Sequence, residues 1–277
     1  MRQAKEFPSD YFLGETTEET RRLREMAAAL ASEAAWLLNR VGVAAGARAV
    51  DVGCGPLGVL DLLWARVGPT GRVVGVERAD AFAQAARAAS AGWGNVDVVR
   101  ADVRDAALPD GTSDVAHERL TLIQASDPAG VLRAMRDLVR PGGLVLAEEF
   151  DCGSWACHPR SRSWDTLLDV FTTVAEDGGA DVTFGRTLPS RLRAAGLDDI
   201  QVSAHVHTPR PGDYLRSHLL SLLESVRSTA LRRRLLTVGE WTELTVQLRQ
   251  HLDDPHTFLV GQTLVQAWGR RPEGAPG

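Results

Sequence analysis

The feature that most constrains this chain is the alternation of short apolar runs with helical patterns between residues 47 and 150. Apolar runs that predict strands occupy 47–52, 72–77, 96–100, 114–117 and 144–150. Apolar residues at helical spacing predict helices over 57–67, 79–90 and 128–139. Strands that alternate with helices in this way predict an α/β fold, with a parallel sheet covered by helices on both faces.

Outside this core the pattern is different. Before it, Thr16 or Thr17 is expected to cap a single long helix that continues to Leu38. After it, the sequence predicts helices over 164–175, 188–195, 213–230 and 232–252, and strands over 200–207 and 258–268. We therefore divide the chain into an N-terminal helical lid (1–45), a core (46–150), and substrate-side helical insertions with the closing strands of the same sheet (151–277).

Composition excludes several classes of protein. The 36 acidic residues outnumber the 31 basic ones and give a net charge of −5, which argues against a nucleic-acid partner. The run Arg232-Arg233-Arg234 is interpreted as the solvated start of a helix. No apolar run reaches the length of a membrane span, and MRQAKEFPSDYFLG has no apolar segment typical of a signal peptide. Three cysteines provide no disulfide framework, so we expect a cytoplasmic protein.

A glycine-rich loop joins the first predicted strand to the first helix. Its sequence, Gly53-Cys54-Gly55-Pro56-Leu57-Gly58, also has the spacing of a dinucleotide-binding loop, which alone is weak evidence. Three acids follow or precede it at strand ends: Asp51, Glu77 and Asp102. A carboxylate such as Glu77 can accept both hydrogen bonds from a ribose diol, and Asp102 can accept a bond from an adenine amino group. These residues suit a ligand with adenine, ribose and a positively charged group.

This ordered set resembles the class I S-adenosylmethionine-dependent methyltransferases of small molecules. The resemblance covers residues 45–150 and includes VDVGCGPLG, Val76-Glu77, Ala101-Asp102, the region around Asp114–Leu120 and the segment before Leu144. It implies a seven-stranded, mostly parallel sheet with the cofactor at the carboxyl ends of strands 1 to 4. It also implies these cofactor-binding residues: Tyr11, Asp51, Gly53, Cys54, Gly55, Glu77, Arg78, Asp102, Val103, Glu118 and Arg119.

The substrate side departs from the simplest form of that fold. Helical insertions are expected after strand 5 and between strands 6 and 7, and both are rich in apolar residues. Trp155 and Tyr214 are our candidates for contact with the substrate, and His158 and Glu149 are our candidates for catalysis, because an oxygen nucleophile benefits from a base. Cys157 lies next to His158, a spacing that does not suit zinc, so we predict no metal.

The expected function is methyl transfer from S-adenosylmethionine to the oxygen, nitrogen or carbon of a small, largely apolar metabolite, in specialised metabolism. Two alternatives stay open. One is a non-methylating enzyme on the same fold, for example a cyclase that retains the cofactor. The other is a nicotinamide-dependent oxidoreductase, which rests on the glycine spacing alone. The expected partner is a small molecule rather than nucleic acid or a membrane, and the apolar lid helices could also support a homodimer.

Overall fold

A seven-stranded sheet forms the centre of the protein in the computed structural model, which describes Tyr11 and residues 13–273. The strand order is β3-β2-β1-β4-β5-β9-β7. The first five strands in the chain run parallel, whereas β9 is antiparallel to both β5 and β7. This confirms the predicted mostly parallel sheet. The strands are β1 (Arg48–Val52), β2 (Arg72–Glu77), β3 (Val96–Arg100), β4 (Ser113–Arg119), β5 (Val139–Asp151), β7 (Asp198–Val206) and β9 (Thr263–Arg270).

Helices cover both faces of this sheet, as the sequence predicts. The helices α2 (Ala31–Val41), α3 (Leu60–Val67) and α4 (Asp80–Ser90) pack on one face, and α5 (Pro128–Leu138) and α7 (Leu188–Ala194) pack on the other. Local signals fix their ends: the Asp127 side chain caps α5, and Gly42 ends α2 in the left-handed conformation at φ 71°. Because the parallel strands share one direction, the loops after β1, β2, β3 and β4 meet at one edge of the sheet.

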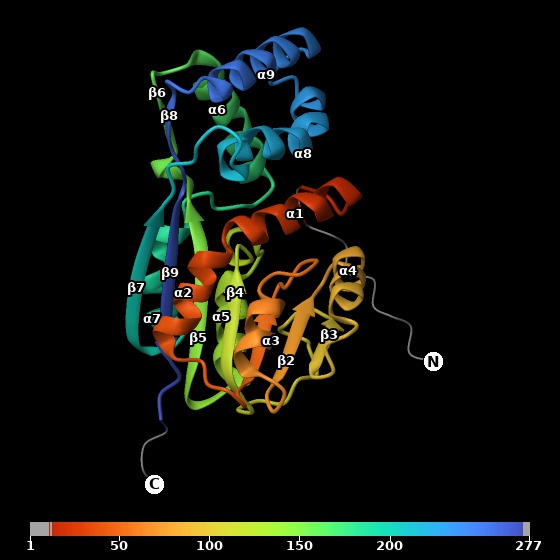
Figure 1. The fold of residues 1–277 in the computed structure, drawn as a ribbon, viewed down its shortest axis with the longest axis vertical. Helices are drawn as coiled ribbons and strands as arrows, with labels where there is room; N and C mark the ends of the chain where they lie inside the picture. Colours follow the sequence, from red (N-terminus) through yellow and green to blue (C-terminus); the bar gives the residue numbers. More distant parts are fainter. Residues whose placement is uncertain (1–10, 12, 274–277) are drawn as a thin grey trace.

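The N-terminal helix differs from the prediction because it is two helices. Thr16 caps α1 (Thr17–Ala29), and Leu30 interrupts the helix at φ −105° and ψ 10° before α2 begins. Leu30 is fully buried against Phe150 and Leu264, at the carboxyl edge of the sheet. The break lets α2 pack on the sheet face while α1 crosses above the strand ends (Figure 1).

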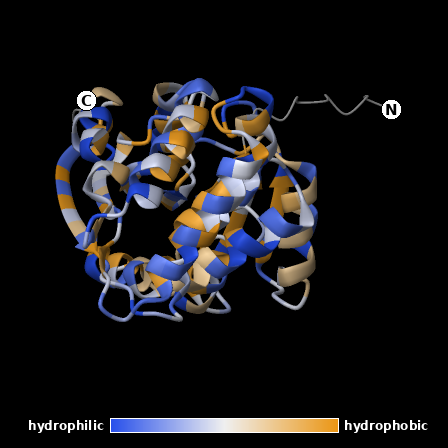
Figure 2. Ribbon diagram, turned by 90° about the horizontal axis from the view of Figure 1, so that it is seen from above, coloured by the Kyte–Doolittle hydropathy of each residue, from blue (hydrophilic) through white to orange (hydrophobic). Residues whose placement is uncertain are grey.

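The residues after β5 build a second layer above that edge. It contains α6 (Arg162–Asp177), α8 (His218–Arg232) and α9 (Val238–Asp253). From here on, the lid means these three helices and does not include the N-terminal helices. The lid has a core of its own, and Figure 2 shows apolar and polar residues alternating along its helices. Amphipathic helices of this kind bury one face and expose the other. None of the helices in the described residues is long and apolar enough to cross a membrane.

Two predictions about the chain after residue 230 are wrong. The arginines 232–234 lie at the end of α8 and do not open the next helix, which begins after a capping box formed by Thr237 and Glu240. The strand predicted over 258–268 is interrupted at Gly261 and Gln262. Its first part, β8 (Phe258–Val260), pairs with β6 (Ala156–His158) beside the lid, and only its second part joins the main sheet as β9.

Candidate active site

A cavity of about 310 Å³ lies between the carboxyl edge of the sheet and the lid. Its first half, which we call the polar half, is lined by the glycine loop and by the ends of β2, β3 and β4. Its second half, the apolar half, is lined by residues of the lid and of the segments beside it, including Phe150, Cys152, Phe171, Ala180, Val182, His218, Leu222 and Gln262. Arg22, Leu23, Met26 and Ala27 of α1 also line the cavity.

The glycine loop can take its shape only with glycine. Gly53 and Gly55 have φ angles of 67° and 54°, a region that side chains rarely adopt. A Cβ atom at Gly53 would lie 2.2 Å from Oγ1 of Thr121, whereas a Cβ at Gly55 would have nothing within 4 Å. The loop therefore packs tightly against the segment after β4 and presents open backbone to the cavity at Gly55.

Glu77 ends β2 and lines the cavity, and the sequence predicts that it contacts a ribose. Its Oε2 accepts a hydrogen bond from the Gly55 N–H at 2.9 Å, and its Oε1 accepts one from the Ala79 N–H at 2.7 Å. Burial raises the pKa of Glu77, while these backbone donors act in the opposite direction. Each oxygen has a second lone pair, so the carboxylate is held in place and can still accept bonds from a ligand.

Asp102 and Val103 follow β3 and also line the cavity. The Arg104 guanidinium binds Asp102 through both carboxylate oxygens, from Nε at 2.9 Å and Nη2 at 2.7 Å. These bonds lower the pKa of Asp102, so it stays ionised. Val103 is buried and offers an apolar surface beside it. The structure thus brings Asp102 and Val103 to the same cavity as Glu77, where the sequence predicts an adenine site.

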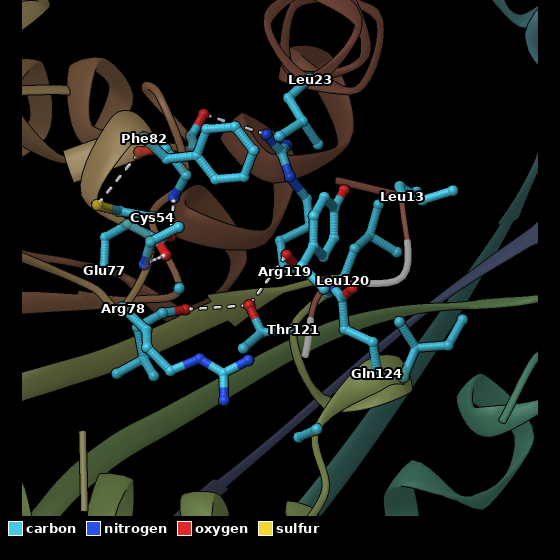
Figure 3. A pocket seen from close by; sticks show the side chains of 18 of the residues that line it. Leu13, Leu23, Cys54, Glu77, Arg78, Phe82, Arg119, Leu120, Thr121 and Gln124 are labelled. Carbon is cyan, nitrogen blue, oxygen red and sulfur yellow. Dashed lines mark hydrogen bonds between the residues drawn. The ribbon is translucent and has the colours of Figure 1, made fainter. Parts of the chain in front are cut away.

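Arg119 provides a positive charge in the polar half (Figure 3). Its Nη2 donates to the carbonyl of Gly58 at 3.1 Å and its Nη1 to that of Leu30 at 3.4 Å. No carboxylate among the described residues pairs with it. A cation held only by backbone carbonyls is available to an anionic ligand group. Tyr11, Cys54 and Arg78, which the resemblance implies as cofactor residues, line the cavity as well.

Asp51 does not line the cavity, although the sequence predicts that it contacts the ligand. It is buried beneath the glycine loop, where its Oδ1 lies 2.8 Å from Nδ1 of His117 and its Oδ2 accepts a bond from the Val59 N–H at 3.3 Å. Nε2 of His117 lies 2.8 Å from Oε1 of Glu148. Burial alone would lower the pKa of His117, but the two carboxylates outweigh it and raise the pKa to about 9. Asp51 is therefore part of a buried ion network that supports the loop.

Glu118 and Glu149 also lie outside the cavity, contrary to the roles that we predict from sequence. Both are fully buried beneath the turn η1 (Leu122–Gln124), where Glu118 accepts a bond from Thr121 N–H and Glu149 one from Ile123 N–H. Burial raises the pKa of Glu118 well above its usual value and that of Glu149 to about 8. Glu118 Oε1 and Glu149 Oε2 have no hydrogen-bond partner among the described residues, and the neighbouring charge of Glu149 adds to the raised pKa of Glu118. The two side chains hold a cavity wall in place.

The remaining three predicted residues belong to the lid region and do not line the cavity. His158 is exposed in β6 and pairs with Phe258, so the structure does not support it as a base. Trp155 is buried in the lid core beside Trp164. Tyr214 donates its hydroxyl hydrogen to the carbonyl of Arg22 at 3.2 Å. The described residues contain no group of three His, Cys, Asp or Glu side chains that could hold a metal ion.

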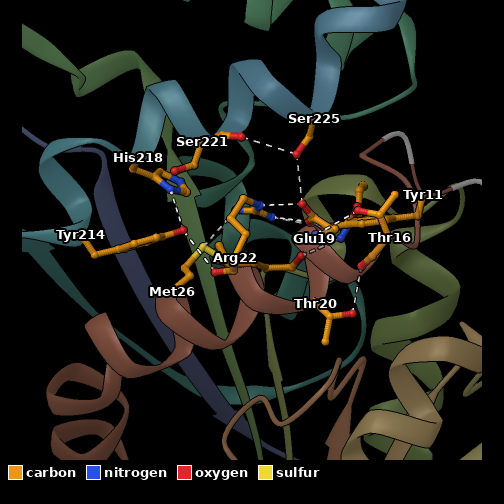
Figure 4. A network of polar contacts seen from close by, with 12 residues as sticks. Tyr11, Thr16, Glu19, Thr20, Arg22, Met26, Tyr214, His218, Ser221 and Ser225 are labelled. Carbon is orange, nitrogen blue, oxygen red and sulfur yellow. Dashed lines mark hydrogen bonds and ion pairs between the residues drawn. The ribbon is translucent and has the colours of Figure 1, made fainter. Parts of the chain in front are cut away.

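A buried ion pair joins α1 to the lid. Arg22 donates from Nε and Nη2 to the two carboxylate oxygens of Glu19, at 2.7 and 2.6 Å (Figure 4). Ser225 of α8 donates to Glu19 Oε2 at 3.1 Å, and the Tyr11 hydroxyl donates to the other oxygen. Burial favours a strong bond here, because water does not compete for either charge. This Glu19–Arg22 clasp joins Tyr11, α1 and α8 beside the cavity.

Several lining residues have no signal in the sequence that could identify them. Phe171 and Leu222 lie at helical spacing like any core residue of α6 and α8. His218 is one of seven histidines, and the only local sign of its contact with Tyr214 is that the two residues are four positions apart. These residues face the cavity because of how the lid packs on the sheet, which local patterns do not encode.

Comparison with known proteins agrees with this geometry. Nocamycin O-methyltransferase from Saccharothrix syringae is 38% identical over 111 residues, which are 39% of this chain and 40% of that protein. The chain spans about a third to three fifths of the length of the curated relatives it matches. Two solved structures share the fold. The [4+2]-cyclase SpnF is 20% identical with a TM-score of 0.52, and the match covers 86% of this chain and 80% of that one. A phosphoethanolamine N-methyltransferase of Haemonchus contortus in complex with S-adenosyl-L-methionine is 15% identical with a TM-score of 0.52, and the match covers 85% of this chain and 51% of that one.

The family comparison covers the centre of the sheet. Residues 50–147, from β1 to the middle of β5, match the methyltransferase domain family. This stretch contains the glycine loop, Glu77, Asp102 and Arg119, which together form the polar half of the cavity. Beyond this stretch the sheet continues with β9 and β7, through the two antiparallel pairings of β9 with β5 and with β7. Residues 50–147 therefore match a methyltransferase domain, and the sheet as a whole has the Rossmann-like fold of the two solved structures.

Proposed function

We propose that this protein transfers a methyl group from S-adenosylmethionine to a small, largely apolar molecule. The observation that carries this proposal is that one cavity has two different halves. The polar half presents the acids and open backbone of a methyltransferase domain, and the apolar half is a covered space of apolar side chains directly beside it. Both reactants need to share one cavity, because methyl transfer requires the nucleophile to be aligned with the methyl group in the absence of water.

The residues present fit S-adenosylmethionine by their chemistry. We assign Glu77 to the ribose hydroxyls, and Asp102 with Val103 to the adenine. Arg119, which has no carboxylate partner among the described residues, suits the carboxylate of the methionine part. The open backbone at Gly55 allows the ligand to approach closely. When bound, the cofactor supplies an already activated methyl group, so the protein has only to bind, orient and exclude water.

The apolar half favours a substrate that is itself largely apolar. Phe150, Phe171, Val182 and Leu222 line it, and burying apolar area against such walls contributes about 25 cal/mol per Å². Nocamycin O-methyltransferase, similar over the core, supports an oxygen acceptor and a place in specialised metabolism. A cyclase that binds the cofactor without consuming it is the second candidate, since the fold is shared with the [4+2]-cyclase SpnF. The family match leaves the nicotinamide alternative without support.

Calorimetric titration tests the proposal. The purified protein is titrated with S-adenosylmethionine, S-adenosylhomocysteine and NADH. We expect micromolar dissociation constants for the first two and no heat from NADH. Tight binding of NADH without a response to S-adenosylmethionine would overturn the proposal. Incubation with S-adenosylmethionine radiolabelled in the methyl group then separates the two candidates, because a cyclase binds the cofactor and a methyltransferase also labels an extractable acceptor.

A further inference from the structure

One histidine lies within the apolar half of the cavity. His218 is the first residue of α8, is 2% exposed and lines the cavity beside Phe171 and Leu222. Burial, with a smaller contribution from the positive charge of Arg22, lowers its pKa to about 3. His218 is therefore neutral at physiological pH, and its ring carries one N–H donor and one acceptor nitrogen.

The neighbours of His218 decide which nitrogen carries the hydrogen. Nδ1 lies 3.3 Å from the hydroxyl oxygen of Tyr214, and that hydroxyl donates its own hydrogen to the backbone carbonyl of Arg22 at 3.2 Å (Figure 4). A carbonyl can only accept, so the Tyr214 oxygen offers a lone pair to His218. Nδ1 is therefore assigned as the donor, and Nε2 is left with a free lone pair. Within the described residues, Nε2 has no hydrogen-bond partner.

A second acceptor without a partner lies in the same cavity wall. Gln124 donates from Nε2 to the carbonyl of Leu120 at 3.1 Å, while its buried Oε1 has no partner in the described part of the chain. Arg22, whose charge acts on His218, makes no hydrogen bond to either acceptor; its side-chain nitrogens contact Glu19, Tyr11 and Met26. A buried acceptor without a donor destabilises the protein, so the cavity is complementary to a ligand that donates hydrogen bonds.

We infer that His218 Nε2 accepts a hydrogen bond from the nucleophilic hydroxyl of the substrate, and that the substrate is therefore an apolar alcohol or phenol. The inference rests on the proposed function and specifies its substrate class. A hydroxyl fits better than an aliphatic amine, which is protonated near neutral pH and whose charge is disfavoured between apolar walls and beside Arg22, and it donates a stronger hydrogen bond than a neutral aromatic amine. A carboxylate offers no hydrogen to Nε2.

The same contact makes His218 a proton acceptor during transfer. The hydroxyl oxygen gives an electron pair to the methyl carbon, the carbon–sulfur bond breaks with its pair left on sulfur, and the hydroxyl proton passes to Nε2. As the methyl group bonds to oxygen, the hydroxyl proton becomes as acidic as that of a protonated ether, which is a much stronger acid than an imidazolium. A histidine of low basicity is therefore sufficient, and the proton leaves His218 to solvent once the product is released.

A matched pair of probes tests this contact without knowledge of the natural substrate. The affinity of 2-naphthol is compared with that of 2-methoxynaphthalene, which has the same apolar rings but no hydrogen to donate. Titrations are made with saturating S-adenosylhomocysteine and again without it. We expect 2-naphthol to bind about fivefold to tenfold more tightly in the wild-type protein, the value of one neutral hydrogen bond. Equal affinities, or no binding of either probe, would overturn the inference.

Variants then assign the preference to one side chain. His218→Phe is expected to reduce the preference to less than about twofold. Tyr214→Phe, which removes the oxygen that holds Nδ1–H but keeps the ring, is expected to reduce it partly. His256→Phe, at an exposed histidine in the turn before β8, is the matched control and should keep the full preference. Thermal melts establish that each variant folds, and an unchanged preference in folded His218→Phe would contradict the inference.

A spectroscopic readout separates this role from a structural one. In protein labelled with nitrogen-15 at histidine, His218 should show an unprotonated Nε2 whose resonance shifts when 2-naphthol binds and stays in place with 2-methoxynaphthalene. A protonated Nε2 in the free protein would overturn the assignment. Failure of S-adenosylhomocysteine to bind would instead count against the proposed function, and the titrations without it keep the two failures apart.

Discussion

The polar and apolar halves of the cavity are built by different means. In the polar half, backbone geometry sets the shape: glycines at positive φ, strand ends and the N–H groups that hold Glu77. In the apolar half, side chains of α6, of α8 and of the segments beside them set the shape. A site made by backbone tolerates few substitutions, whereas a site made by side chains can change its ligand by single replacements.

The halves should therefore respond differently to mutation. Changes in the polar half are expected to alter cofactor binding or the stability of the sheet. Changes in the apolar half are expected to alter the binding of an apolar probe and leave the cofactor unaffected. The four predictions below test this separation, with the largest expected effect first.

Phe171→Ala is expected to have the largest effect. Phe171 is 5% exposed, lines the apolar half and belongs to the lid core, so its truncation should lower the free energy of unfolding by about 3–5 kcal/mol. The affinity for 2-naphthol should fall, while that for S-adenosylhomocysteine should stay within about twofold. Val170→Ala, one residue away and outside the cavity lining, is the control for lid stability. An equal loss of naphthol affinity in both variants would contradict the separation.

Gly53→Ala is expected to cost about 3 kcal/mol of unfolding free energy. The positive φ contributes part of this, and the approach of the new Cβ to Thr121 contributes the rest. Gly55→Ala has a similar φ but open space around its Cβ, so it should cost only about 1 kcal/mol. Denaturant titrations of both variants give the difference. Equal losses of unfolding free energy in the two variants would show that the loop can shift away from Thr121 at little cost and would contradict the tight packing.

Glu77→Gln should weaken S-adenosylhomocysteine binding by about tenfold to a hundredfold, since bonds to a charged group contribute about 1.5–3 kcal/mol. An amide has only one oxygen that accepts hydrogen bonds, so the variant side chain cannot bind the N–H groups of both Gly55 and Ala79 as the two carboxylate oxygens do. The side chain therefore also loses its fixed orientation. Calorimetry measures the change. The affinity of 2-naphthol should stay the same, and a parallel loss of both ligands would show that the halves are coupled.

The dependence of stability on pH should arise in the sheet core. The folded protein raises the pKa of His117 from 6.5 to about 9, so its stabilisation is present below pH 6.5 and is lost as pH rises through 9. Glu149, raised from 4.5 to about 8, changes stability in the same direction across its own range. Between pH 6.5 and 9 we expect the free energy of unfolding to fall by about 1.4 kcal/mol per pH unit for each proton that the folded state binds and the unfolded state does not.

Denaturant titrations across that pH range check this slope. Glu149→Gln should make the slope shallower below pH 8, because the amide does not titrate and only the contribution of His117 is left. His218→Phe should leave it unchanged, since burial lowers the pKa of His218 to about 3 and its contribution changes only at acidic pH. A slope that disappears with His218→Phe would place the pH sensitivity in the lid and reverse the comparison.

The same two halves differ in how far the sequence predicts them. The strands around the glycine loop, and the positions of Glu77 and Asp102 at strand ends, follow from local patterns and are found where expected. The direction of a side chain at the end of β1 or β4 does not follow. Asp51 and Glu118 point to His117 and to the turn η1, because neighbouring strands bring those groups beside them.

The lid could be predicted only as a set of helices. The break at Leu30 depends on burial against Phe150, and the exposure of His158 depends on the pairing of β6 with β8, so both are tertiary effects. One local signal is present and could have corrected the start of α9: Thr237 followed three residues later by Glu240 is a capping box. The role that we infer for His218 depends on Tyr214 and Arg22 together, which no pattern in the sequence relates.

The place of β9 in the sheet has a consequence for how the protein assembles. β9 follows every other described strand in the chain, yet it lies between β5 and β7, and these two strands do not pair with each other. During synthesis, β7 and all of the lid emerge before the strand that attaches β7 to the sheet. Closing this sheet depends on contacts between distant parts of the chain, which slow folding. The nascent chain must therefore keep an unpaired edge strand from aggregating until residues 263–270 have left the ribosome.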